Sequence, residues 1–211
     1  MQWLIFWSKL KMIKLITRVI PASAFWIATI MWVVFIVDAL LITSNFNHFG
    51  IQPRTLNGLL GIAFSPFLHA NLIHIISNTL PLIIISSILK LSIGSTRTNI
   101  VIVLSIIGSG LGTWMFSTAG VVVGASGLIY GLIGFLFANA YFSPSFRSWL
   151  IALLTFFLYG GTLASLFVVL PHVSWAGHAW GFISGILIAA SMSSYLKANP
   201  HKKETSKEAS K

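Results

Sequence analysis

Residues 124–130 read Gly124-Ala125-Ser126-Gly127-Leu128-Ile129-Tyr130 and place a serine between glycines at the head of an apolar segment. About fifty residues later, Gly177-His178-Ala179-Trp180-Gly181 places a histidine inside a second apolar segment. Polar side chains at membrane depth are costly, so a hydroxyl and an imidazole there usually have a function. The pair predicts a serine nucleophile, Ser126, and its base, His178, working inside a bilayer.

The composition around these segments is typical of a membrane protein. Of the 211 residues, 56% are hydrophobic and only 8% are charged, whereas a soluble domain carries roughly 25% charged residues. The chain has no cysteine, which excludes disulfides, thiol catalysis and thiolate metal sites. The formal net charge of +10 is compatible with nucleic-acid binding, but the placement of the charges argues against such a partner.

Six apolar segments are candidates for membrane-spanning helices, because a bilayer core of about 30 Å needs roughly 20 residues. Glycines and prolines separate them, and the predicted spans are 22–43, 72–89, 99–117, 126–142, 149–170 and 175–196. The fourth span is short and begins at Ser126 itself. We therefore expect an all-α membrane protein with six transmembrane helices.

The positive charges give this bundle an orientation. With the N-terminus taken as cytoplasmic, Arg54 is the only one of the 13 Lys and Arg residues on the outer side. The positive-inside rule then predicts that both termini are cytoplasmic. We expect a multi-pass integral protein of a bacterial inner membrane.

The two ends of the chain are set apart from the predicted spanning domain, 22–196. In the leader, 1–21, Trp3 and Trp7 precede a cluster of lysines. This order fits an amphipathic segment lying in the membrane interface, and a frayed basic leader is an equal alternative. The polar basic tail, 197–211, is expected to be disordered.

Helix geometry explains why Ser126 and His178 are candidates. Ser126 opens its span, where unpaired backbone N–H groups and the helix dipole favour a nearby negative charge such as an oxyanion. Glycines recur at 127 and 131 and at 181 and 185, so two small-residue faces let the fourth and sixth spans approach closely. The alternatives are a helix-packing serine and a lone interfacial histidine bonded to a carbonyl or water.

Further polar residues cluster at the start of the second span and after Ser126. His74 and Asn78 lie one helical turn apart on one face, and as donors they are candidates for an oxyanion hole. Tyr130 follows Ser126 by four residues and is either a stacking partner of His178 or an ordinary packing aromatic.

Other chemistries lack the acids that they need. A metal site at His69, His74 and Asn78 has no acid nearby, and nothing resembles H-E-x-x-H, so we expect no metal and no cofactor. The only acids are Asp38, Glu204 and Glu208. Aspartyl-type proteolysis is therefore excluded, and with Asp38 expected to be a capped or interfacial charge, a dyad replaces the Ser-His-Asp triad.

These residues resemble the rhomboid family of intramembrane serine proteases. The resemblance is carried by G-x-S-G with Tyr130, by H-x-x-x-x-H-x-x-x-N at His69, His74 and Asn78, and by G-H-x-x-G-x-x-x-G at His178. It implies a minimal six-span core in which Ser126 is the nucleophile and His178 the general base. It also implies oxyanion donors at His74, Asn78 and the backbone near Gly124 and Ser126, with His69 as a structural partner.

The same resemblance implies the fold of the first loop and the class of substrate. The loop of residues 44–71, with Gly50-Ile51-Gln52-Pro53-Arg54, resembles a membrane-embedded hairpin. The expected partners are transmembrane segments of single-span proteins, reached from the bilayer beside the fifth span, where Gly160-Gly161 and Pro171-His172 offer flexibility. A non-cleaving rhomboid-like binding or quality-control protein and a transporter remain alternatives, and the sequence does not indicate an oligomeric state.

Overall fold

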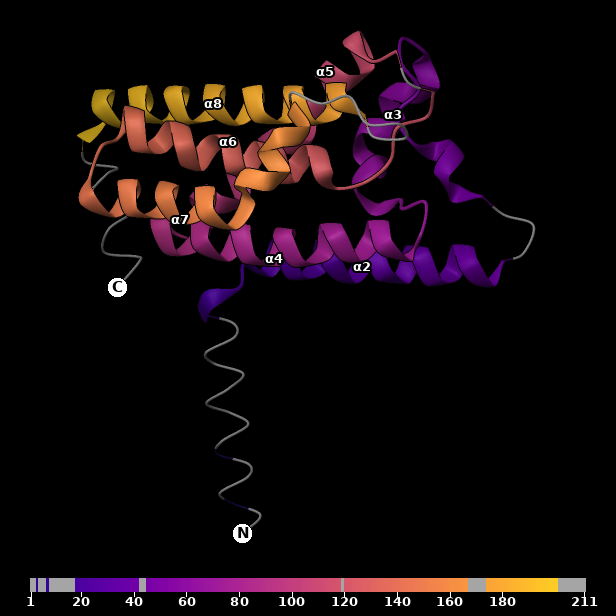
Figure 1. Ribbon diagram of the computed structural model, residues 1–211, viewed down its shortest axis with the longest axis horizontal. Coiled ribbons are helices and arrows are strands. Elements are labelled where there is room, and N and C mark those ends of the chain that lie inside the picture. Colours follow the sequence, from indigo (N-terminus) through magenta and orange to yellow (C-terminus); the bar gives the residue numbers. More distant parts are fainter. Residues whose placement is uncertain are drawn as a thin grey trace.

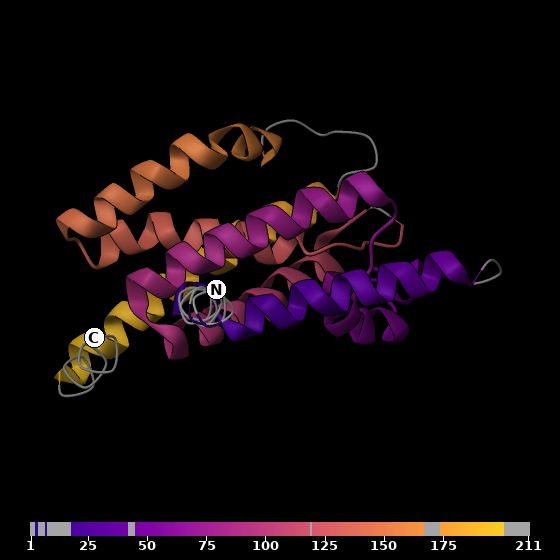
Figure 2. The same ribbon diagram turned by 90° about the horizontal axis from the view of Figure 1, so that it is seen from below.

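The computed structural model describes Trp3, Trp7 and residues 18–41, 45–118, 120–166 and 174–200. These residues form a bundle of helices that run along one long axis (Figures 1 and 2). Between the described stretches of chain the one β-type pairing is an isolated bridge that joins Ile51 to Val122. The α-helices are α2 (Ala22–Leu40), α3 (Leu56–Phe64), α4 (Leu72–Ile93), α5 (Ser95–Phe116), α6 (Ser126–Phe142), α7 (Phe146–Leu163) and α8 (Trp175–Ala198), with 3-10 turns η1 (Phe46–Phe49), η2 (Ser65–Phe67) and η3 (Ala164–Leu166).

The predicted all-α membrane fold is confirmed. In the described part of the chain, five helices, α2, α4, α5, α7 with η3, and α8, are long and apolar enough to cross a membrane, and α6 is a shorter apolar helix of 17 residues. Each predicted span corresponds to one of these helices, and α6 has the predicted bounds. The predicted boundary between the second and third spans was too wide, because Gly94 alone, with φ +84°, separates α4 from α5.

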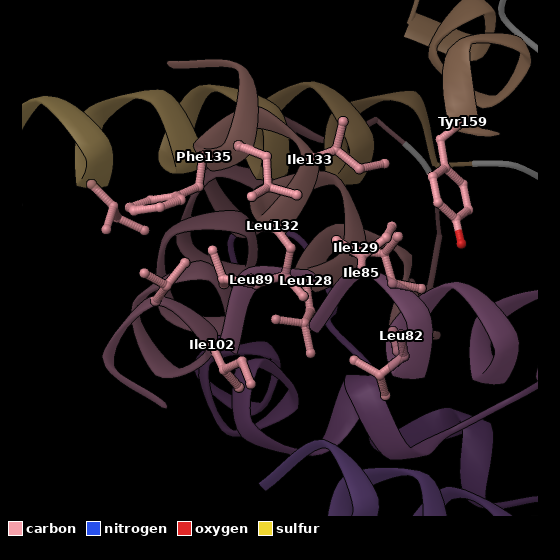
Figure 3. Close-up of a cluster of buried hydrophobic side chains, with 14 of the residues drawn as sticks. Leu82, Ile85, Leu89, Ile102, Leu128, Ile129, Leu132, Ile133, Phe135 and Tyr159 are labelled. Atoms are coloured by element: carbon pink, nitrogen blue, oxygen red, sulfur yellow. The ribbon is translucent and has the colours of Figure 1, made fainter. Parts of the chain in front are cut away.

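Helix α6 lies inside the bundle. Side chains from all around it are buried, including Leu128, Leu132 and Phe135. Figure 3 shows them facing residues of α4 and α5 such as Leu82 and Ile102. A helix that is apolar on every face is suited to such a buried position. The first residue of α6 is therefore held by the core rather than by a surface loop.

Helices α6 and α8 touch through their backbones. A β-carbon on Gly181 would collide with the carbonyl oxygen of Gly127, and one on Gly185 would collide with that of Gly131. The predicted close approach of two small-residue faces is thereby confirmed. Figure 1 shows the two helices side by side along their length. This contact sets the separation of the helix ends that carry Ser126 and His178.

The first loop is fastened to the end of α5 and to the loop before α6. The guanidinium of Arg54 donates hydrogen bonds to the carbonyl oxygens of Met115 (3.3 Å) and Ser117 (2.8 Å), and its backbone N–H donates to Trp114 (3.0 Å). These carbonyls lie at the C-terminal end of α5, where a helix leaves acceptors unpaired and favours a cation. Arg54 adopts φ +58° to make these contacts. The position of this loop within the bilayer stays a prediction.

Several predictions concern residues that the structure describes only in part or not at all. Apart from Trp3, Trp7 and residues 18–21, the leader lies outside the described residues, as do the tail beyond Pro200 and the predicted flexible segment at Pro171-His172. Asp38 is described, and one of its carboxylate oxygens accepts a hydrogen bond from the backbone N–H of Phe46 (2.8 Å). This bond is in keeping with the prediction that Asp38 is a capped or interfacial charge.

The α6–α8 contact predicts a steric penalty for a single methyl group. Gly181→Ala places a β-carbon against the Gly127 carbonyl, and we expect it to cost about 1–3 kcal/mol although alanine favours a helix by about 1 kcal/mol over glycine. The readout is the thermal unfolding midpoint of the purified protein in detergent. Gly161→Ala on α7 is the matched control, because a β-carbon there meets nothing within 4 Å. Equal midpoints for the two variants would contradict the proposed backbone contact.

Candidate active site

Ser126 is the first residue of α6, and the chain reaches it through a turn that requires glycine. Gly124 has φ +111° and donates its backbone N–H to the carbonyl oxygen of Ser65 (2.8 Å). Glycine adopts this backbone conformation without steric cost, whereas other residues are strained in it. Ser126 is half-buried. The first N–H groups of α6 point out of the helix end beside it, where no helical acceptor exists for them.

A small cavity adjoins this helix end. Its volume is about 20 Å³, and its lining includes Gly124, Ser126, Gly127 and Thr113. A cavity of this size holds about one water molecule when polar groups line it. The hydroxyl of Ser126 therefore lies beside a space suited to a single small polar molecule.

His178 lies in the first turns of α8 and stacks on Tyr130. The two rings have centroids 4.1 Å apart and planes inclined by 14°. Both side chains are buried. Tyr130 follows Ser126 by one turn of α6, so the helix that carries the serine also carries the surface against which the imidazole rests. The stacking that the sequence left open is present, and its role in catalysis stays a prediction.

A hydroxyl network fixes the other side of the imidazole. His178 Nδ1 lies 3.2 Å from Ser165 Oγ, within hydrogen-bond distance. The Tyr130 hydroxyl donates to the carbonyl oxygen of Thr162 (2.6 Å) and is also hydrogen-bonded to Ser165. With Nδ1 engaged, Nε2 is the ring nitrogen left for a reacting group. Ser165 was missed by the sequence analysis, since its one signal is a hydroxyl in an apolar span, without a motif around it.

The structure brings the segments of Ser126 and His178 together without a hydrogen bond between them. A β-carbon on Gly127 would lie 3.4 Å from the carbonyl oxygen of Gly177, so the residues next to Ser126 and next to His178 are in contact. Within the described chain, the hydrogen bond of the His178 ring goes to Ser165 rather than to Ser126. Nucleophile–base bonds are often long in enzymes without substrate and tighten when substrate binds.

His74 lies against the turn that precedes Ser126. A β-carbon on Gly124 would be 2.6 Å from Nε2 and 2.8 Å from Cε1 of His74. The imidazole therefore occupies the place of the missing side chain, two residues before the serine. Asn78 is buried, and its side-chain Nδ2 donates to the backbone carbonyl of His74 (2.8 Å). That bond uses one of the two amide protons and leaves the other for a second acceptor.

His69 is buried beside His74 with no partner for its ring. The centroids of the two imidazoles are 5.0 Å apart, and the rings meet edge to face at 63°. Neither ring nitrogen of His69 has a hydrogen-bond partner among the described residues. Burial, and to a smaller extent the neighbouring His74, lower the pKa of His69 to about 4. The ring is therefore neutral near pH 7, and an uncharged donor and acceptor lies next to His74.

The described residues contain no group of three or more histidine, aspartate or glutamate side chains placed to hold a metal ion. His74 and the Gly124 turn thus form one group next to Ser126. Tyr130, Ser165 and His178 form a second group. This arrangement can orient an imidazole and offer N–H donors next to a hydroxyl, which are the elements of acyl transfer.

Comparison with known proteins relates this chain to a family. The family model described as "Rhomboid domain" matches residues 56–195. An uncharacterized protein of Mycobacterium tuberculosis is 35% identical over 169 residues, which cover 76% of this chain and 68% of that protein. An uncharacterized protein of Mycobacterium leprae is 34% identical over 189 residues, covering 84% and 72%. RHOMBOID-like protein 1 of Arabidopsis thaliana is 36% identical over 129 residues, covering 58% of this chain and 31% of its own length.

The turn before Ser126 predicts a large difference between two nearby glycines. Gly124→Ala forces a strained backbone conformation, which costs about 1–3 kcal/mol by itself, and adds a β-carbon where the His74 ring lies. We expect a clear drop in the thermal unfolding midpoint in detergent. Gly120→Ala in the same loop is the control, because its β-carbon meets nothing within 4 Å. If Gly124→Ala has the same thermal unfolding midpoint as Gly120→Ala and the parent protein, the turn at position 124 does not require glycine.

Proposed function

The chain belongs to the Rhomboid family, and we infer that it is an intramembrane serine endopeptidase that cleaves transmembrane segments of single-span membrane proteins. The observation that carries the proposal is the placement of Ser126 at the N-terminus of the buried helix α6, in contact with the end of α8 that bears His178. A nucleophile and a base from distant parts of the chain are thereby held by one helix pair.

The first half of the proposed reaction is acylation of Ser126. His178 Nε2 takes the proton of the Ser126 hydroxyl as the oxygen attacks a peptide carbonyl of the substrate. The new C–O bond gives a tetrahedral intermediate with a negative oxygen. His178 then gives the proton to the leaving nitrogen, the C–N bond breaks, and an acyl-enzyme ester remains on Ser126.

The oxyanion of that intermediate is stabilised by donors around the head of α6. The unpaired backbone N–H groups of the first turn and the positive end of the helix dipole supply one set. His74 beside Gly124 supplies a side-chain donor, and Asn78 has one amide proton beyond its bond to the His74 carbonyl. Donors of this kind are worth about 3–4 kcal/mol of transition-state stabilisation each.

The second half of the reaction needs water at a depth where lipid excludes it. The cavity of about 20 Å³ next to Ser126 has room for about one water molecule. His178 removes a proton from that water as it attacks the ester, and Ser126 regains its proton when the acyl group leaves. A substrate helix hides its amides in internal hydrogen bonds, so it has to unwind locally before attack. The positive-inside distribution of lysine and arginine supports a site that opens toward the outer face.

Cleavage assays with two alanine variants test the proposed class and mechanism together. The purified protein in detergent is mixed with a generic single-span substrate, and products are followed by gel and mass spectrometry. We expect cleavage by the parent protein and a loss of at least a thousandfold in Ser126→Ala and in His178→Ala. Ser77→Ala on α4 is the control hydroxyl variant, since Ser77 donates to its own helix at the His74 carbonyl.

The outcome also separates the rival functions. A folded parent protein that binds the substrate and leaves it intact would indicate a non-cleaving binding protein. Cleavage that persists in Ser126→Ala would exclude the dyad.

Ser165 is predicted to be a positioning residue for His178. Ser165→Ala removes the partner of Nδ1, so we expect kcat to fall about tenfold, or about 1.4 kcal/mol, with KM unchanged. Ser165→Thr keeps the hydroxyl and is expected to restore most of kcat. A purely structural role would lower kcat in both variants in proportion to their loss of folded protein. Equal kcat values for Ser165→Ala and the parent would contradict the positioning role.

A further inference from the structure

A second cleft lies at the end of the bundle away from Ser126. Its volume is about 660 Å³, and it opens where α4, α6 and α8 end and where α5 and α7 begin. Figure 1 shows the turn from α6 to α7 and the last turns of α8 at this one end of the molecule. Since α6 has 17 residues and rises about 1.5 Å per residue, the cleft is about 25 Å from the serine. The proposed reaction makes no use of it.

The lining of this cleft is cationic. Arg97, Arg147 and Lys197 contribute to it, together with polar groups such as Asn139 and Ser143. Among the described residues that line the cleft there is no carboxylate. Among the described residues the one acid is Asp38, and its carboxylate is bonded to the backbone of Phe46 beyond the far end of α2. Three cationic side chains thus line one space.

Helix dipoles offset only a small part of this charge. Three helix C-termini and two N-termini meet at the cleft, and each carries a partial charge of about half an elementary charge, so their sum is about half a negative charge. Arg147 donates to the carbonyl oxygen of Leu91 at the end of α4. A guanidinium has five N–H donors, so this bond leaves most of them for a ligand. The described residues around the cleft therefore sum to a net positive charge, which favours an anionic ligand.

The donor set suits a phosphate group. Arginine binds phosphate oxygens in a bidentate manner, and hydroxyl and amide groups such as those of Ser143 and Asn139 complete such a shell. The volume of 660 Å³ is far larger than one phosphate needs and falls in the range of sites for whole small molecules. Phe142 and Leu196 add apolar surface to the lining.

The surroundings of the cleft indicate a lipid rather than a soluble phosphate. Tyr141, Phe146 and Trp149 flank it in sequence and are 74%, 86% and 59% exposed. Aromatic side chains of this kind gather at the headgroup level of a bilayer. Basic pockets between transmembrane helices on the cytoplasmic side are suited to anionic headgroups. We propose that this cleft binds the phosphate of an anionic phospholipid in the leaflet on the lysine- and arginine-rich side.

The test measures lipid binding to the full chain and is independent of any proteolytic activity. The purified protein in an uncharged detergent is titrated with dioleoyl phosphatidylglycerol, with dioleoyl phosphatidylcholine and with inorganic phosphate, and occupancy is read by native mass spectrometry. We expect phosphatidylglycerol to bind at least tenfold more tightly than phosphatidylcholine. In Arg97→Gln/Arg147→Gln the preference is expected to fall at least tenfold. Arg18→Gln, which removes one charge from an exposed position in the leader, is expected to change it less than twofold.

Lys197→Gln provides a second variant, because Lys197 is exposed and its removal should leave the fold intact even if the double arginine variant unfolds. It is expected to weaken phosphatidylglycerol binding severalfold. Equal affinity for the two lipids, or an unchanged preference in both cleft variants, would overturn the proposal. So would binding of inorganic phosphate in place of phosphatidylglycerol. If phosphatidylglycerol bound to the Glu204→Gln/Glu208→Gln variant and not to the parent protein, the carboxylates of the tail would be the ligands of the cleft. That result would overturn the proposal as well.

Discussion

Along α6 and α8 the backbones of two helices meet where glycines face one another. The carbonyl oxygens of Gly127 and Gly131 occupy the places where Gly181 and Gly185 would have side chains. Between helices in lipid there is no hydrophobic driving force, so close packing of this kind carries much of the association. The contact begins one residue after Ser126 and runs past His178, so it also decides how far apart these two side chains lie. Any side chain inserted here would move the candidate site together with the core.

Among the described residues, no carboxylate orients the histidine of the candidate site. In a Ser-His-Asp triad a buried acid holds the imidazole in the correct tautomer, whereas here a ring stack with Tyr130 and a bond to Ser165 engage the same ring from two sides. Both partners are neutral, which avoids the cost of placing a second charge in a medium of low dielectric constant. The consequence is an imidazole held by the fit of α6 against α8 and by one hydroxyl from η3.

Sequence reasoning predicted the parts of this protein that follow from local pattern. The bounds of α6 and the pairing of two glycine-rich faces depend on apolar length and on spacing, and both are readable in one dimension. The end of α4 was predicted too early and the start of α5 too late, because Gly94 alone provides the turn and the residues on both sides of it are helical. Ser165 could not be predicted, since its importance arises only when the end of α7 meets α8. The bond of Asn78 to the His74 carbonyl likewise depends on a rotamer, which spacing alone does not determine.

Arg54 is the exception to an otherwise one-sided distribution of basic residues, and its contacts give that exception a physical meaning. A positive charge on the translocated side opposes the bias that orients a nascent chain during insertion. In the folded protein the same guanidinium is hydrogen-bonded to carbonyls at the end of α5, so its charge is stabilised by the negative end of the helix dipole. In the proposed orientation, biogenesis would favour a neutral residue at this position while the finished fold favours the arginine. Arg54 is thus unfavourable for membrane insertion and favourable for the stability of the folded protein.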